Sequence, residues 1–85
     1  MVKKNPEYPK VAQRKNISGY VILQYTVTET GTVKDITVLR SSPEGVFDEA
    51  ARQAAIKYRY LPRIVDGKPT RVTGVKTRII FEMIE

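Results

Sequence analysis

The sequence contains neither cysteine nor histidine. Without cysteine the chain forms no disulfide, the usual support of a small secreted domain, so its fold must depend on an apolar core or on a partner. Cysteine and histidine are also the common ligands of structural zinc, and histidine is the most frequent general base. We therefore expect no metal site and no cofactor.

Catalytic groups of other kinds are equally scarce. Ser41 and Ser42 have no histidine to activate them. Asp48 and Glu49 are adjacent on a predicted helix, so their carboxylates point in different directions and do not form an acid/base pair. The glycines form no phosphate-binding run. The sequence thus predicts a protein that is not an enzyme and has no catalytic residue.

Long apolar runs are missing as well: none approaches the roughly 20 residues that cross a bilayer, and no segment has the pattern of a signal peptide. The 85 residues suit a single domain. Lysine and arginine total 15 against 9 acidic residues, a formal charge of +6. This excess favours an anionic partner, namely nucleic acid, lipid headgroups or an acidic peptide, although scattered basic residues more often serve solubility.

The spacing of apolar residues predicts an α+β fold. Pro9 suits the start of a short helix that turns Val11 and Ala12 inward, and Asn16 suits a left-handed cap at its end. Gly31 can supply the positive φ of a tight hairpin turn. The predicted elements are helix 10–15, strand 20–28, strand 33–40, helix 46–58 and, after a turn at 66–69, strand 75–84.

Smaller features refine these elements. The phase of the second strand slips after Val33, which predicts either a bulge near Lys34 and Asp35 or a strand that is apolar on both faces. The segment 41–43, Ser-Ser-Pro, ends that strand and offers an N-cap for the long helix. Within this helix Asp48 and Arg52 are spaced for an i,i+4 ion pair.

The order helix, strand, strand, helix, strand restricts the topology. The first two strands form an antiparallel hairpin, and a right-handed crossover through the long helix places the third strand beside the first. We therefore predict a three-stranded antiparallel sheet of order 2-1-3, with two helices packed on one face. The predicted core consists of Val21, Leu23, Tyr25, Val27, Phe47, Ala51, Ala54, Ile79 and Phe81. The third strand is then a long open edge, and Lys76 and Arg78 alone guard its outer face.

Short motifs in a fixed order give this chain a resemblance to a known family. They are Tyr-Pro-x-x-Ala at 8–12, Gly-x-Val at 19–21, Thr-Gly-x-Val at 30–33, Ser-Ser-Pro at 41–43, Phe-Asp-x-Ala-Ala at 47–51, Tyr-Arg-Tyr-x-Pro at 58–62 and Asp-Gly-x-Pro at 66–69. Together they resemble the C-terminal domain of the TonB family over residues 6–84. Two positions depart from the family pattern: Tyr58 stands where tryptophan is usual, and Asn5 where the best-known branch has glutamine.

The resemblance implies a periplasmic domain of an inner-membrane protein, with an irregular lead-in over 1–8 and the domain proper over 9–85. It implies binding to the TonB box of outer-membrane receptors for siderophores, haem or cobalamin, and coupling to an ExbB/ExbD motor through a preceding part of the parent protein. Combined with the open edge, it predicts a partner-binding site of Asn5, Pro6, Tyr8, Val75, Lys76, Thr77, Arg78, Ile79, Ile80 and Phe81, with Arg59 as a further candidate.

Two other functions stay open at this point. Tyr20 and Tyr25, with basic residues nearby, suggest a sheet surface that stacks the bases of single-stranded nucleic acid, but their spacing places them on opposite faces. A TonB-like module can also serve another periplasmic protein, such as a sensor or a TolA-like linker. The open edge further permits two copies to pair as a homodimer.

Overall fold

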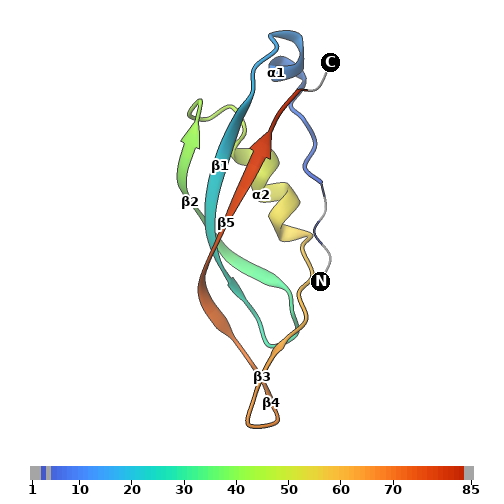
Figure 1. Ribbon diagram of the computed structural model, residues 1–85, viewed down its shortest axis with the longest axis vertical. Helices are drawn as coiled ribbons and strands as arrows, with labels where there is room; N and C mark the ends of the chain where they lie inside the picture. Colours follow the sequence, from blue (N-terminus) through green and yellow to red (C-terminus); the bar gives the residue numbers. More distant parts are fainter. Residues whose placement is uncertain (1–2, 4, 84–85) are drawn as a thin grey trace.

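The computed structural model describes residue 3 and residues 5–83, and in it the chain forms an elongated α+β domain of 50 × 22 × 15 Å (Figure 1). Its elements are α1 (Lys10–Arg14), β1 (Gly19–Val27), β2 (Val33–Ser42), α2 (Asp48–Ile56), β3 (Arg63–Val65), β4 (Lys68–Thr70) and β5 (Val72–Phe81).

The main sheet has three strands in the order β2-β1-β5, and β1 is antiparallel to both neighbours. At the centre, Leu23 of β1 lies opposite Val38 of β2 and Thr77 of β5. Since β5 is the third strand that the sequence predicts, the predicted order 2-1-3 is confirmed. The crossover through α2 returns the chain to the open side of β1.

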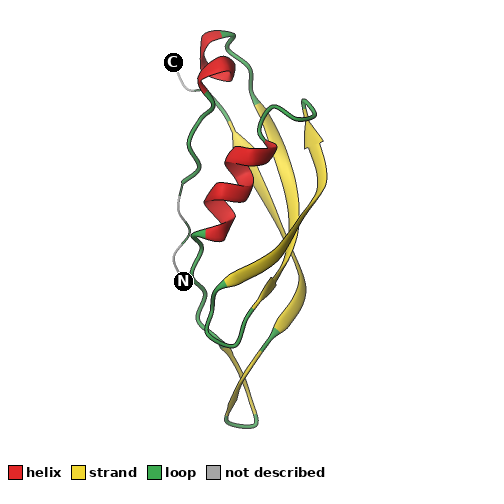
Figure 2. Ribbon diagram, turned by 180° about the vertical axis from the view of Figure 1, so that it is seen from behind, coloured by secondary structure: helices red, strands yellow, loops and turns green. Residues whose placement is uncertain are grey.

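The helix α2 covers one face of the sheet (Figure 2). Odd-numbered residues of β1, from Val21 to Val27, point toward it and are buried. All nine predicted core residues are at most 6% exposed, and Ala12 of α1 joins the same cluster. Phe47 stacks on Phe81 with ring centroids 4.4 Å apart. Apolar burial on this one face, the main driving force of folding, therefore fixes which side of the sheet the helices occupy.

Several predicted boundaries and contacts are wrong. The helix α2 begins at Asp48, and its N-cap is Phe47 without a side-chain cap bond, because β2 continues through both serines expected to cap it. Val11 points outward, since a helix of five residues is too short for its apolar phase to be read. Arg52 donates to the carbonyl of Ile36 on β2 at 3.0 Å, in place of the predicted ion pair with Asp48 of its own helix.

Of the two alternatives predicted for β2, a bulge or a strand that is apolar on both faces, the structure has the bulge. The register between β1 and β2 shifts between Gln24 and Thr26, and Asp35 has the positive φ of 54° that an extra residue imposes. A second shift, between Ile22 and Leu23, was not predicted. Both irregularities leave β1 itself continuous, because the extra residues belong to β2.

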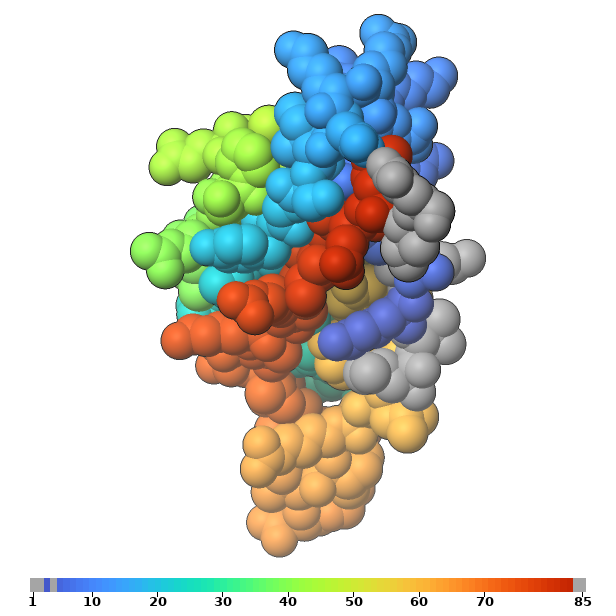
Figure 3. Space-filling view, turned by 45° about the horizontal axis from the view of Figure 1, so that its top comes forward, coloured from blue at the N-terminus to red at the C-terminus, as the bar shows by residue number. Residues whose placement is uncertain are grey.

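The segment between α2 and β5 also differs from the prediction. The turn at 66–69 is part of a small hairpin, β3–β4, which projects from the body as an arm (Figure 3). Every residue of β3 is exposed, so the arm has no alternation of buried and exposed positions to predict it from. The strand β5 begins at Val72, three residues earlier than expected, and a bulge with Gly74 at φ 67° separates this start from the rest. Residue 84, the predicted end of the strand, lies outside the described residues.

Candidate partner-binding edge

The strand β5 pairs with β1 along one side, and in the described part of the chain no strand pairs with its other side (Figure 1). Unpaired N–H and C=O groups along an edge can bond to another extended chain. Which residues present these groups depends on the register, because successive residues of a strand turn their N–H and C=O to opposite sides.

A hydrogen bond in the β1–β2 hairpin shows which residues of β1 turn their backbone groups toward β2. The N–H of Thr28 donates to the carbonyl of Thr32, toward β2, at 2.8 Å. The bulges lie in β2 and β5, so alternation continues unbroken along β1. Even-numbered residues of β1 therefore turn their N–H and C=O toward β2, and odd-numbered residues turn theirs toward β5.

The pairing of β1 with β5 then assigns the open edge. Gly19, Val21, Leu23 and Tyr25 lie opposite Phe81, Ile79, Thr77 and Val75, which use their backbone groups within the sheet. The residues that turn their N–H and C=O outward are accordingly Lys76, Arg78 and Ile80. Four of the seven predicted β5 residues thus turn their backbone groups into the sheet, and the side chains of Ile79 and Phe81 lie in the core.

The side chains of the three edge residues lie on the outer face of the sheet, away from α2. The guanidinium carbon of Arg78 lies 5.2 Å from the ring centroid of Tyr20, a cation–π geometry that holds the charge beside the edge. Ile80 is 60% exposed. A shallow hollow of about 420 Å³ lies between Tyr20, Arg78 and Ile80. This surface offers one fixed cation and one apolar side chain to an adjacent strand.

The lead-in runs past β5 on the side away from β1 (Figures 1 and 3). Tyr8 anchors it: the ring packs edge-on against Phe47 and Phe81, and the hydroxyl donates to the carbonyl of Ile17. Among the described residues no backbone hydrogen bond joins the lead-in to β5. Asn5 is exposed and Pro6 half-buried, and both line the groove beside α2.

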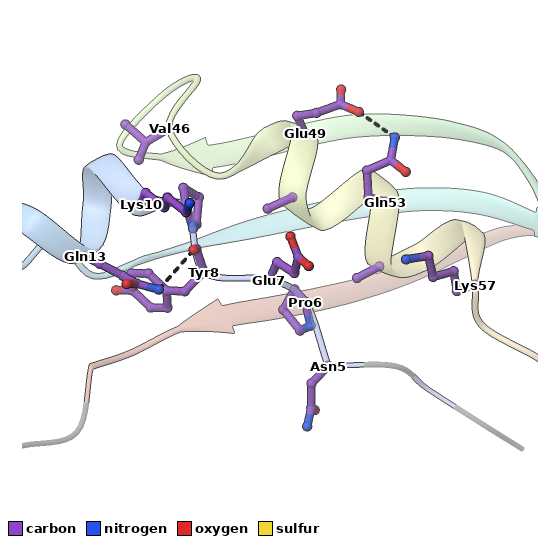
Figure 4. Close-up of a pocket in the computed structure, with 13 residues that line it drawn as sticks. Asn5, Pro6, Glu7, Tyr8, Lys10, Gln13, Val46, Glu49, Gln53 and Lys57 are labelled. Carbon is purple, nitrogen blue, oxygen red and sulfur yellow. Dashed lines mark hydrogen bonds between the residues drawn. The ribbon is translucent and has the colours of Figure 1, made fainter.

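A groove of about 880 Å³ separates the lead-in from α2 (Figure 4). Glu7 and Lys10 line one wall, and the other is lined by Glu49 and Gln53 of α2 and by Lys57, the C-cap of that helix. Gln53 donates to Glu49 at 2.8 Å along the helix, which leaves a wall of mixed charge. At its start the lead-in approaches the end of the helix, where Lys3 Nζ lies 5.4 Å from the ring centroid of Tyr58.

Arg59, the further candidate, has a local role. Its guanidinium donates to the carbonyls of Tyr58, at 2.8 Å, and Ile56, at 3.3 Å. The Ile56 carbonyl is the last of α2 and the Tyr58 carbonyl lies two residues beyond, at the helix end where C=O groups lack partners and a cation is favoured. The arrangement supports helix capping by Arg59, and the side chain remains exposed.

The two tyrosines considered for base stacking are separated by the sheet. Tyr20 lies on the outer face under Arg78, whereas Tyr25 is 1% exposed in the core. Burial raises the pKa of Tyr25 far above its usual value, and it also raises the pKa of Tyr58. Because Tyr20 and Tyr25 lie on opposite faces of the sheet, they do not form a stacking platform.

Two residues near the site were missed by sequence reasoning. Tyr20 stabilises the position of Arg78, and Tyr60 bonds through its hydroxyl to Tyr25. The Tyr-Arg-Tyr motif contains Tyr60, but it lies outside any periodic element, so no pattern indicated its partner. Within the described residues there is no group of three or more histidine, cysteine, aspartate or glutamate side chains placed to hold a metal, and no helix long and apolar enough to span a membrane.

An open edge strand with unpaired backbone groups and a cation beside it is the kind of surface that protein-binding modules of the strand-addition class use. Comparison with known proteins gives the family. Residues 4–83 match the model of the Gram-negative bacterial TonB protein C-terminal region, and the chain belongs to this family. Membership agrees with the expectation of a non-catalytic domain.

Relatives and solved structures support the assignment. The chain is 41% identical over 80 residues to protein TonB of Pseudomonas aeruginosa and 32% identical over 78 residues to that of Escherichia coli. The two matches cover 94% and 92% of this chain, which corresponds to only 23% and 30% of the length of the respective relatives. The solution structure of the Pseudomonas aeruginosa TonB C-terminal domain has a TM-score of 0.85 at 34% identity, covering all of this chain and 85% of that one. The TonB2 protein of Vibrio anguillarum has a TM-score of 0.73, also at 34% identity, over 95% and 76% of the two chains.

Proposed function

We propose that this domain binds an extended segment of an outer-membrane receptor, the TonB box, by strand addition to the open edge of β5. The observation that supports the proposal most strongly is the outward direction of the N–H and C=O groups of Lys76, Arg78 and Ile80, which follows from the register with β1. A partner strand completes this row of hydrogen bonds, and each net bond contributes about 0.5–1.5 kcal/mol.

The chemistry beside the edge defines the partner further. Lys76 and Arg78 favour a segment with acidic residues, and exposed Ile80 favours an apolar side chain next to them. Long-range attraction to a chain of charge +6 raises the association rate more than the final affinity. Main-chain bonds are independent of side-chain identity, so different receptors need share only a short acidic-apolar pattern. In this account Asn5, Pro6 and Tyr8 close over one end of the segment.

Family membership supports a proposal about the wider role. We propose that the domain is the periplasmic part of an inner-membrane transducer, which passes energy from an ExbB/ExbD motor to receptors for siderophores, haem or cobalamin. A strand added along β5 and pulled along its axis loads several hydrogen bonds at once, which suits the transfer of force. We place the irregular lead-in at 1–8 and the domain proper at 9–85.

Two competing uses of the same edge are separable. A second copy of the chain can pair through β5 as a homodimer, which competes with the receptor segment. A different periplasmic protein can also use this module for a contact that transmits no force. Sedimentation over a range of concentrations detects the first. Exchange of this domain for that of an authentic transducer, with receptor-dependent uptake as the readout, tests the second.

The binding experiment is an NMR titration of the labelled domain with a synthetic peptide that copies a TonB box. We expect the amide shifts of Lys76, Arg78 and Ile80 to change most and their exchange with solvent to slow. A single-stranded oligonucleotide of equal charge serves as control, and its weak binding should vanish near physiological salt. Peptide-induced changes confined to the groove beside α2, with the β5 amides unaltered, contradict the proposal.

A further inference from the structure

Three hydroxyl groups meet in the core behind the open edge. The hydroxyl of Tyr25 on β1 bonds to the hydroxyl of Tyr60 and, at 2.7 Å, to Oγ1 of Thr77 on β5. The rings of Tyr25 and Tyr60 pack at a steep angle with centroids 6.2 Å apart. Tyr25 is 1% exposed, whereas Tyr60 and Thr77 are half-buried, so these bonds are partly shielded from water. Hydrogen bonds in such a low-dielectric setting are electrostatically stronger than in water.

Tyr60 is itself held to the far end of the sheet. Its N–H donates to the carbonyl of Gly31, in the β1–β2 turn, at 2.8 Å. Gly31 has a φ of 86°, and a Cβ at this position would overlap the carbonyl oxygen of Tyr60. Only glycine therefore lets the connection after α2 run against the turn. The chain Gly31–Tyr60–Tyr25–Thr77 joins that turn, the connection after α2, β1 and β5.

Thr77 has a particular place on β5. Its backbone groups bond to β1 opposite Leu23, while its neighbours Lys76 and Arg78 face the open edge. In the part of the chain that the structure describes, the Tyr25–Thr77 bond is the one side-chain hydrogen bond that β5 makes. An edge strand has a single neighbour, so β5 is attached to the domain by the β1 ladder, this bond and the cation–π contact of Arg78 with Tyr20.

We propose that the hydroxyls of Tyr25, Tyr60 and Thr77 form a clasp that keeps β5 on the sheet while a partner bound to its open edge is under load. The inference rests on the proposed function. Force on an added strand reaches β5 first and then passes to β1. The clasp adds a second path from the middle of β5 to the β1–β2 turn. Tyr25, Tyr60 and Thr77 are positioning residues in this account, since their hydroxyls do not contact the partner.

Native-state hydrogen exchange tests the clasp without any partner. Tyr60→Phe and Thr77→Val each remove one hydroxyl of the cluster at nearly constant volume. Tyr58→Phe is the matched control, because no hydrogen bond is formed by the Tyr58 hydroxyl among the described residues. We expect both clasp variants to speed exchange of the Thr77 and Ile79 amides by on the order of tenfold relative to the amides of α2. An equal acceleration of all amides, or none, overturns the clasp.

A pulling experiment tests the function of the clasp. The domain is anchored through its N-terminus, and force is applied through a bound TonB-box peptide. Tyr60→Phe should shorten the lifetime of the complex under load several-fold and leave the affinity without load unchanged, because β5 remains closed in nearly all molecules. Lifetimes equal to those of Tyr58→Phe contradict the proposal. If the peptide fails to bind the unaltered domain, the proposed function is wrong, and the exchange result still decides whether the clasp holds β5.

Discussion

Phe47 is the side chain on which the fold depends most. It is fully buried, stacks on Phe81 at 4.4 Å and meets the edge of Tyr8 at 5.5 Å, so it joins α2, β5 and the lead-in. Truncation of a buried phenylalanine to alanine costs about 3–5 kcal/mol, and the lost aromatic pairs place Phe47→Ala in the upper half of that range. A domain of 85 residues has a total stability of only about 4–13 kcal/mol.

The assay is urea and thermal unfolding followed by circular dichroism. Each kcal/mol shifts the Tm of a domain this size by about 4–8 °C, so Phe47→Ala should melt at least about 16 °C lower or be unfolded at room temperature. Ile56→Ala, on the exposed face of α2, is the control and should change Tm by no more than about 3 °C. If the Tm of Phe47→Ala lies within about 2 °C of that of the unaltered domain, the packing described here is refuted.

Gly31→Ala should lower the free energy of unfolding by at least about 2 kcal/mol, because the alanine would have a positive φ and its Cβ would overlap the Tyr60 carbonyl. Gly45 also has a positive φ but has open space around it, so Gly45→Ala should lower the free energy of unfolding by only about 1 kcal/mol. Equal losses in urea unfolding would contradict the close approach of Gly31 and Tyr60. Burial raises the pKa of Tyr25 and Tyr58, so their contribution to stability should be complete below about pH 10 and fall above it by about 1.4 kcal/mol per pH unit for each tyrosine. Tyr58→Phe should reduce this slope in urea unfolding at alkaline pH, and an unchanged slope argues against burial of that hydroxyl. In stopped-flow measurements, Arg78→Ala should lower the association rate for an acidic peptide and make that rate less dependent on salt. An association rate of the unaltered domain that does not change with salt argues against electrostatic steering.

The sheet order and the core are readable from the sequence for a physical reason. Strict alternation from Val21 to Val27 assigns one face of β1 to the core, and period-two patterns fix side-chain direction whatever the partner strand does. Phe47 and the alanines of α2 repeat at helical spacing, which gives the matching face. Once two elements and one tight hairpin are known, the handedness of the crossover leaves a single place for β5.

Other features depend on contacts that no local pattern records. The strands of the arm, including Ile64, are exposed, so no burial pattern distinguishes them from a loop. The link from Tyr60 to Gly31 and Tyr25 joins segments far apart in the chain. The outward direction of the Arg78 backbone required the register of β5 against β1, and a bulge at Gly74 shifts that register without a clear sequence signal.

The central claim is that the outward backbone groups of β5 are the partner site, and a pair of proline substitutions tests it most directly. Proline removes one N–H, and Thr77 and Arg78 turn theirs to opposite sides of the strand. We predict that Thr77→Pro loses the fold, whereas Arg78→Pro stays folded and loses the TonB-box peptide. Arg78→Ala, which removes the charge but keeps the N–H, should retain most of the affinity. A folded Arg78→Pro that binds the peptide as tightly as Arg78→Ala contradicts strand addition along this edge.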